Sequence, residues 1–175
     1  MKILILLLTF CLALPVEASE PYRDIKWEEL VPKGWDPAKD LKGLDFATLS
    51  DSDPRAMEAL EKLRRLWDEA PTEPALNGRR IRIPGFVIPL ERKGEQVLEF
   101  LLVPYFGACI HTPPPPANQI VHAVSAKPLG KMQTMDTVWV TGTLGLQRAE
   151  TQWGHAGYRL SVDKVTPYEA PKGKK

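Results

Sequence analysis

The sequence predicts a mainly β protein with one N-terminal helix, folded as a small OB-like β-barrel. Only residues 54–69 carry a clear helical spacing of apolar residues. From residue 77 onward, alternating patterns and short apolar stretches between turn residues indicate about five strands. Glycines 142 and 145 lie within one such stretch and suit the bends of a closed barrel. A β-sandwich is the alternative architecture.

The first 18 residues have the pattern of a secretory signal peptide. Lys2 supplies a positive charge, residues 3–14 form an apolar stretch, and Val16 and Ala18 place small residues before a cleavage site. The apolar stretch is shorter than the roughly 20 residues that a membrane span requires. We therefore expect cleavage after Ala18, a periplasmic location, and no stable membrane span afterwards.

After the signal peptide we expect an extended arm at residues 19–50, a single helix-plus-barrel domain at 51–170 and a basic tail at 171–175. The aromatic residues of the arm are predicted to pack on the domain, because large aromatic side chains are usually buried. The formal net charge of the chain is +1. Such a balance gives no electrostatic case for binding nucleic acid or an anionic membrane.

One helix is predicted at residues 54–69. Asp53 suits the N-cap, and Pro54 suits the first helical position because its missing N–H costs no hydrogen bond there. We expect one apolar face, packed in the core, from Met57, Leu60, Leu63 and Trp67.

The strands are justified by alternation and by apolar runs. They are predicted at residues 80–83, 85–88, 97–105, 119–125, 138–146 and 158–162. A polar turn at 91–95 separates the second from the third.

The most informative stretch runs from Gly107 to Thr112 and contains Cys109 and His111, followed by prolines 113–116. Because Cys11 leaves with the signal peptide, Cys109 has no intramolecular disulfide partner in an oxidising compartment. Two residues apart in an extended segment, the thiol and the imidazole point to one side of the backbone. Together they suit a zinc ion or, alternatively, copper. The proline run restricts the loop before any ligand binds.

Two ligands leave a zinc site incomplete, and the sequence offers two more histidines. His122 lies on the strand that returns from the loop, and we expect it to be the third ligand beside Cys109 and His111. His155, in a turn-like segment, is the alternative. A histidine on an apolar strand face is also commonly a hydrogen-bonded core residue.

Three interpretations of Cys109 therefore stay open: a metal ligand, a small buried hydrophobic residue, and a nucleophile. A nucleophile needs a lowered thiol pKa, and no helix N-terminus or known nucleophile motif accompanies this cysteine, so we expect a non-enzymatic protein. Under the metal interpretation, Asn118 and Gln119 are expected to orient the ligands.

The same stretches resemble a bacterial family of exported proteins whose domain has no assigned function. The resemblance lies in residues 102–119, which carry Gly-Ala-Cys-Ile-His-Thr-Pro-Pro-Pro-Pro-Ala-Asn-Gln, in residues 83–90, and in residues 27–32. It implies a periplasmic protein or lipoprotein of Gram-negative bacteria, encoded beside an ABC transporter similar to lipoprotein or macrolide exporters in zinc-responsive operons. The implied partner is an envelope protein such as that transporter or its periplasmic subunit.

The sequence thus leads to two hypotheses for function. The first is a periplasmic metal-binding accessory protein that sequesters zinc or hands it over, linked to an ABC transporter. The alternative is a non-enzymatic protein-interaction module of the cell envelope, whose rigid proline loop docks on a partner.

Overall fold

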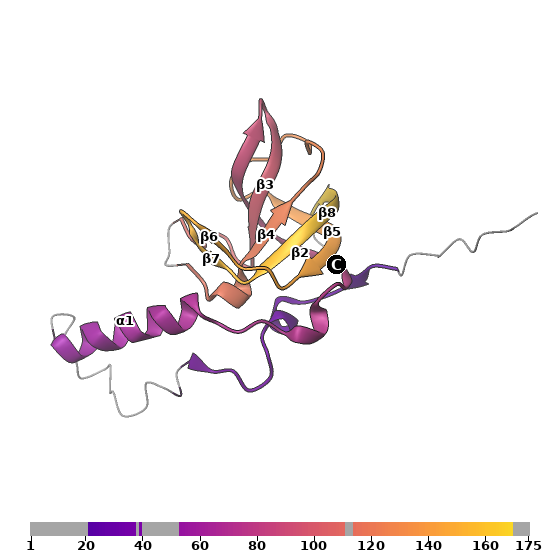
Figure 1. Cartoon of the computed structure of the whole chain (residues 1–175). Helices are drawn as coiled ribbons and strands as arrows, with labels where there is room; N and C mark the ends of the chain where they lie inside the picture. The colour runs from indigo at the N-terminus through magenta and orange to yellow at the C-terminus, as the bar shows by residue number, and fades with distance from the viewer. Residues whose placement is uncertain (1–20, 38, 40–52, 111–113, 170–175) are drawn as a thin grey trace, which may run out of the picture.

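The computed structural model describes residues 21–37, 39, 53–110 and 114–169, and it shows a closed β-barrel with one α-helix beside it (Figure 1). The barrel strands are β2 (Arg80–Lys93), β3 (Gln96–Val103), β4 (Val121–Val124), β5 (Thr137–Gly145) and β8 (Tyr158–Pro167). They follow the order β2-β3-β4-β8-β5, and β5 pairs back with β2 to close the barrel. Only the β4–β8 pair is parallel within this ring. The predicted mainly β class and small OB-like barrel are confirmed.

The long strand β2 belongs to both sides of the barrel closure. Its first half, up to Phe86, pairs with β5, and its second half pairs with β3. The strand continues through Pro84, where a break had been expected from the sequence, and the Pro84 carbonyl accepts a hydrogen bond from the indole of Trp27 at 2.7 Å. Pro89 lies next to a register shift, a position at which strands tolerate proline.

The barrel encloses the main core, and a second apolar cluster lies outside it. The inward side chains are fully buried and include Ile81, Ile83, Phe100, Leu102, Val121, Val140 and Leu160. The outer cluster is built on Ile88, Leu101 and Val103, which alternate with the inward residues of β2 and β3. The loop after β3 covers this outer cluster, so the loop position is set by strand alternation.

Gly142 marks a bulge in β5, as its place in the sequence predicted. The pairing of β5 with β8 shifts between Thr141 and Gly142. A Cβ atom at position 142 would overlap the carbonyl oxygen of Ser161 on β8. Glycine is therefore required here by close backbone approach.

The N-terminal arm packs on the barrel over its described part. Strand β1 (Arg23–Asp24) pairs in parallel with the start of β2, and the 3-10 helix η1 (Trp27–Leu30) follows it. Leu30 is completely buried, and its carbonyl accepts a hydrogen bond from the hydroxyl of Tyr158 at 2.6 Å. The expected aromatic packing is thus seen for Trp27, whereas residues 19, 20, 38 and 40–50 of the predicted arm lie outside the described residues.

The helix α1 (Pro54–Asp68) forms where the sequence predicted it but does not pack as predicted. Asp53 caps its N-terminus by accepting a hydrogen bond from the Arg55 N–H at 2.9 Å. The expectation that its whole apolar face is core is wrong, because Met57 is 61% exposed and Leu60 is 58% exposed. Most of the helix projects away from the barrel (Figure 1). In the described part of the chain, no helix has the length and apolar character needed to cross a bilayer.

A small hairpin, which was not predicted from the sequence, contacts the C-terminal end of α1. Strands β6 (Ala149–Thr151) and β7 (Gly154–Ala156) pair with each other outside the barrel. Arg148, just before the hairpin, donates hydrogen bonds to the carbonyls of Asp68 and Ala70. The 3-10 helices η3 (Pro74–Leu76) and η4 (Ala117–Gln119) complete the connections on this side.

Candidate functional site

The loop after β3 turns sharply at Cys109. Gly107 and Cys109 both have positive φ angles, 84° and 65°. Glycine adopts this left-handed conformation readily, whereas a cysteine there carries backbone strain. Short-range hydrogen bonds hold the turns, from the Ala108 N–H to the Tyr105 carbonyl and from the Ile110 N–H to the Gly107 carbonyl. The extended conformation assumed from the sequence for Cys109 is therefore wrong.

The side chain of Cys109 packs against the outer apolar cluster, with its thiol half-buried. It lies there with Ile110, on the cluster built from Leu101, Val103 and Ile120. Burial raises the pKa of the Cys109 thiol to about 11. A cysteine nucleophile requires the opposite shift, so this environment disfavours a free thiolate at neutral pH. A bound cation would be needed to stabilise the thiolate here.

His122 lies on the same outer face of the barrel, on β4. It is only 8% exposed, and its register partner on β3 is Leu101, a member of the outer cluster. Its Nε2 atom lies 2.9 Å from Oε2 of Glu99, which projects from the same face of β3. Because a carboxylate only accepts hydrogen bonds, this contact places the imidazole proton on Nε2.

Among the described residues, the other ring nitrogen of His122 is left without a partner. Its Nδ1 atom is buried and has no hydrogen-bond partner among the described residues. In the neutral imidazole that carries its proton on Nε2, Nδ1 has a lone pair that can accept a hydrogen bond or bind a metal ion. Metal-binding histidines commonly have their second nitrogen held by a carboxylate in this way. The chemistry of His122 therefore fits a ligand role, with Glu99 as the residue that orients the ring.

The predicted site is only partly within the described structure. Cys109 and His122 both lie on the outer face formed by β3 and β4 and the loop between them, whereas His111 lies outside the described residues. Within the described ranges, no group of three or more His, Cys, Asp or Glu side chains could hold a metal ion. Glu99 was missed from the sequence, although a single acidic residue within the apolar run 97–103 is a recognisable signal.

His155, the alternative third ligand, contacts the C-terminal end of α1. It belongs to β7, and its Nδ1 atom is 3.1 Å from Oδ1 of Asp68 at the end of α1. Its Nε2 atom is 4.0 Å from Oε1 of Glu150 on the paired strand β6. No described contact joins His155 to Cys109 or His122. The ring therefore links the hairpin to the helix.

Asn118 and Gln119 also make contacts other than the expected ones. The Asn118 side-chain amide donates to the carbonyl of Pro71 at 3.0 Å, and the Gln119 amide donates to the carbonyl of Trp27 at 2.9 Å. Both amide groups thus fasten the end of the loop to the segments that precede the barrel. The Oδ1 atom of Asn118 is buried with no hydrogen-bond partner in the described structure. None of the described hydrogen bonds supports an orienting role toward Cys109 or His122.

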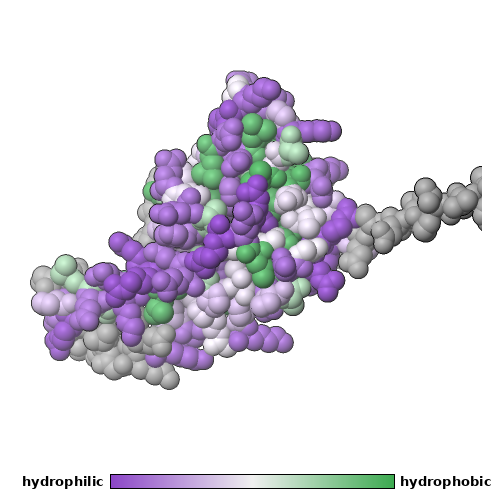
Figure 2. All heavy atoms as spheres, in the orientation of Figure 1, coloured by the Kyte–Doolittle hydropathy of each residue, from purple (hydrophilic) through white to green (hydrophobic). Residues whose placement is uncertain are grey.

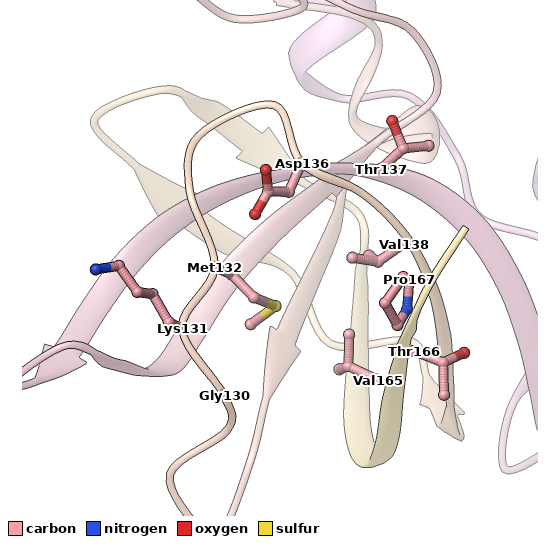
Figure 3. Close-up of a pocket in the computed structure, with 9 residues that line it drawn as sticks. All are labelled: Gly130, Lys131, Met132, Asp136, Thr137, Val138, Val165, Thr166 and Pro167. Atoms are coloured by element: carbon pink, nitrogen blue, oxygen red, sulfur yellow. The ribbon is translucent and has the colours of Figure 1, made fainter. Parts of the chain in front are cut away.

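A separate hollow of about 420 Å³ lies at one end of the barrel (Figure 3). Met132, Val138 and Val165 point into it, and the Lys131 side chain points away from it. Lys131 forms an ion pair with Glu95 at 3.0 Å. No cysteine or histidine is among the described residues that line this hollow, so it is distinct from the predicted metal site.

A family model described as "Protein of unknown function (DUF3299)" matches residues 27–167. The chain belongs to the DUF3299 family. It is similar to the crystal structure of a DUF3299 family protein from Pseudomonas aeruginosa, with 37% sequence identity and a TM-score of 0.67. That similarity covers 87% of this chain and 99% of the Pseudomonas chain. The match includes the loop of Cys109, the strand of His122 and Glu99, all within the DUF3299 region.

Two tRNA synthetase structures resemble smaller parts of the chain. Asparaginyl-tRNA synthetase from Pyrococcus horikoshii, complexed with asparaginyl-adenylate, has 20% identity and a TM-score of 0.36, covering 57% of this chain and 21% of that one. A putative aspartyl-tRNA synthetase from Leishmania major has 18% identity and a TM-score of 0.38, covering 58% and 20%. Both scores are too low to bear on function. Comparison with curated proteins finds no match.

Proposed function

We propose that this DUF3299 protein binds zinc, or alternatively copper, through Cys109, His111 and His122. One observation carries the proposal. His122 is buried, its Nε2 is held by Glu99, and its Nδ1 has no hydrogen-bond partner among the described residues. A buried nitrogen lone pair without a partner is costly unless a cation or donor fills the position.

The chemistry of the residues suits a soft or borderline cation. Cys109 would supply a thiolate and His122 a neutral imidazole, and zinc sites are built from these two groups. Metal binding would also release the thiol proton that burial otherwise retains, because burial raises the pKa of Cys109. A fourth position would remain for water or for a group from a partner, which suits storage or transfer of the metal.

The test compares metal content and zinc affinity in matched variants. The full chain is expressed, and the exported protein is purified without chelators and assayed for metal. We expect near-stoichiometric zinc or copper, lost in Cys109→Ser and His122→Ala. Glu99→Gln should keep the site but weaken zinc binding by about 10- to 100-fold, the usual effect of removing a carboxylate that orients a metal-binding histidine.

His155→Ala is the control, because it also removes a histidine but lies at the helix–hairpin contact. It should leave zinc affinity unchanged. The proposed site is wrong if the protein retains no metal after incubation with zinc. It is also wrong if His155→Ala abolishes zinc binding while His122→Ala does not. Circular dichroism of each variant separates loss of the site from loss of the fold.

The proposed setting follows from the predicted signal peptide and from the family resemblance. We place the protein in the periplasm as a non-enzymatic accessory that sequesters zinc or hands it to a transporter-linked partner. The raised pKa of Cys109 supports the non-enzymatic part, since it disfavours a thiolate nucleophile. Export of the full chain with cleavage after Ala18 is checked by mass spectrometry of the periplasmic protein.

A second candidate function is a protein-interaction module, and one observation favours it. Tyr105 and Phe106, at the start of the loop, are 44% and 68% exposed. Exposed aromatic residues beside a constrained proline loop suit docking on an envelope protein. Under this alternative, Cys109→Ser would leave partner capture intact, whereas Phe106→Ala would weaken it.

A further inference from the structure

Helix α1 carries an apolar stripe that is exposed over its N-terminal half. Met57, Leu60 and Trp67 lie on one side of the helix, since positions three and seven residues apart fall close together on a helical surface. Met57 and Leu60 are among the most exposed large apolar side chains of the described chain. The side of α1 visible in Figure 2 is mainly hydrophilic, so the helix is amphipathic. Exposed apolar side chains of this kind commonly mark an interaction surface.

The C-terminal half of the same stripe lines a groove of about 670 Å³. Leu60, Leu63 and Trp67 form the wall on the helix side. Pro114 and Gly154, from the end of the loop and from the hairpin, form the opposite wall. The helix thus presents protruding apolar side chains at one end and an apolar groove at the other.

These two halves are complementary when a second copy of the helix runs antiparallel to the first. If Met57 of one copy lies opposite Trp67 of the other, Leu60 lies opposite Arg64. Each copy then inserts its exposed N-terminal side chains toward the groove of its partner. The two contacts are equivalent by a two-fold axis, which is the commonest symmetry of protein dimers. The span from residue 57 to residue 67 is about 15 Å, or nearly three helical turns.

The charges of α1 select the same orientation. Residues 54–61 carry Arg55, Glu58 and Glu61, a net charge of −1, and residues 62–68 carry Lys62, Arg64, Arg65 and Asp68, a net charge of +2. Within one helix, Glu61 also pairs with Arg65 at 2.7 Å. An antiparallel pair places the acidic half of each helix opposite the basic half of the other. A parallel pair would place like charges together, which is unfavourable.

We propose that the occupant of this helix groove is a second copy of the chain, joined through an antiparallel α1–α1 contact. Shape and charge of the same fifteen-residue helix both support this choice. The contact is small, so we expect a reversible dimer with a dissociation constant on the order of micromolar.

The test is sedimentation velocity of the exported full chain from about 1 to 200 µM, a range that brackets such a constant. The weight-average mass should rise from monomer to dimer with concentration. Leu60→Lys should raise the dissociation constant by about tenfold or more, because it places a positive charge opposite Arg64 of the partner copy at the centre of the contact. Leu60 is 58% exposed in the single chain, so this substitution should leave the fold intact.

Phe106→Lys is the matched control, because Phe106 is 68% exposed but lies on the loop after β3. It should dimerise like the unmodified chain. Glu61→Arg and Arg64→Glu should each weaken association, and the double variant should restore it. A monomer throughout the range would overturn the proposal and point to a different occupant for the groove. Equal weakening by Phe106→Lys, or no rescue by the double charge swap, would also overturn it.

Discussion

Removing the hydroxyl of Tyr158 should destabilise the protein far more than removing any exposed tyrosine hydroxyl. Tyr158 is completely buried at the start of β8. Its hydroxyl donates to the carbonyl of Leu30 at 2.6 Å and accepts from the N–H of Glu73 at 2.6 Å. One phenol group therefore joins the barrel to the N-terminal arm and to the segment after α1.

The size of this destabilisation follows from the two backbone groups that lose their hydrogen-bond partner in Tyr158→Phe. The ring is retained, so little apolar contact is lost. An unsatisfied buried carbonyl costs about 1–3 kcal/mol, and the partly buried N–H of Glu73 adds about 1 kcal/mol. We expect a loss of roughly 2–4 kcal/mol in the free energy of unfolding, equivalent to a fall in Tm of about 5–15 °C for a domain of this size.

Urea denaturation and thermal unfolding of the exported protein measure this loss. Tyr22→Phe is the control, because the Tyr22 hydroxyl donates an exposed hydrogen bond to Asp163 at 2.8 Å. Its loss should change the free energy of unfolding by less than about 0.5 kcal/mol. A cost for Tyr158→Phe as small as that of the control would refute the proposed role of the hydroxyl.

The same hydroxyl predicts how stability depends on pH. Burial raises the pKa of Tyr158 to about 12, above the ordinary value of 10.0. Because the folded state holds this proton more tightly, its contribution is complete below pH 10 and is lost as the pH rises toward 12. Burial also raises the pKa of Cys109 from 9.0 to about 11, so a Cys109→Ser background isolates the tyrosine. In that background, Tyr158→Phe should reduce the alkaline loss of stability.

Two further predictions test the barrel and the loop. Gly142→Ala should lower the free energy of unfolding by at least about 2 kcal/mol, because its Cβ would overlap the Ser161 carbonyl. Gly130→Ala is the control: a Cβ there meets open space, so the change should be less than about 1 kcal/mol. Urea denaturation measures both. Equal effects would show that the close approach at Gly142 is unimportant. Iodoacetamide should alkylate Cys109 slowly at neutral pH, at a rate that rises about tenfold per pH unit and levels off only near pH 11. A plateau by pH 8 would show that burial does not raise the pKa of this thiol.

The barrel was predictable because alternating apolar and polar residues identify which face of a strand is buried. Ile81 and Ile83, which alternate with arginines in the sequence, belong to the barrel core, and the bulge at Gly142 lies where glycine interrupts an apolar strand. Proline gave a less reliable signal. Pro84 suggested a strand break, yet β2 continues through it with the Pro84 carbonyl bonded to Trp27, a contact between residues 57 positions apart.

The candidate site was predictable in its residue types but not in its geometry. The sequence pointed to Cys109 and His122, but it gave no sign of the left-handed backbone at Cys109. The pairing of His122 with Glu99 depends on the register between β3 and β4, which places Glu99 opposite Val124 and Leu101 opposite His122. A local pattern does not determine that register, so Glu99 was recognised only in the folded chain.

Helix α1 shows why an amphipathic pattern identifies a face but not what covers it. The spacing of Met57, Leu60, Leu63 and Trp67 correctly predicted a helix with one apolar side. Such a side most often packs in the core of the same domain, so the pattern predicts core packing. Among the described residues, Arg148 donates hydrogen bonds to the C-terminal end of the helix, and His155 contacts Asp68 at that same end. The apolar stripe therefore extends beyond the barrel, and its opposed acidic and basic halves favour a second, antiparallel copy as its cover.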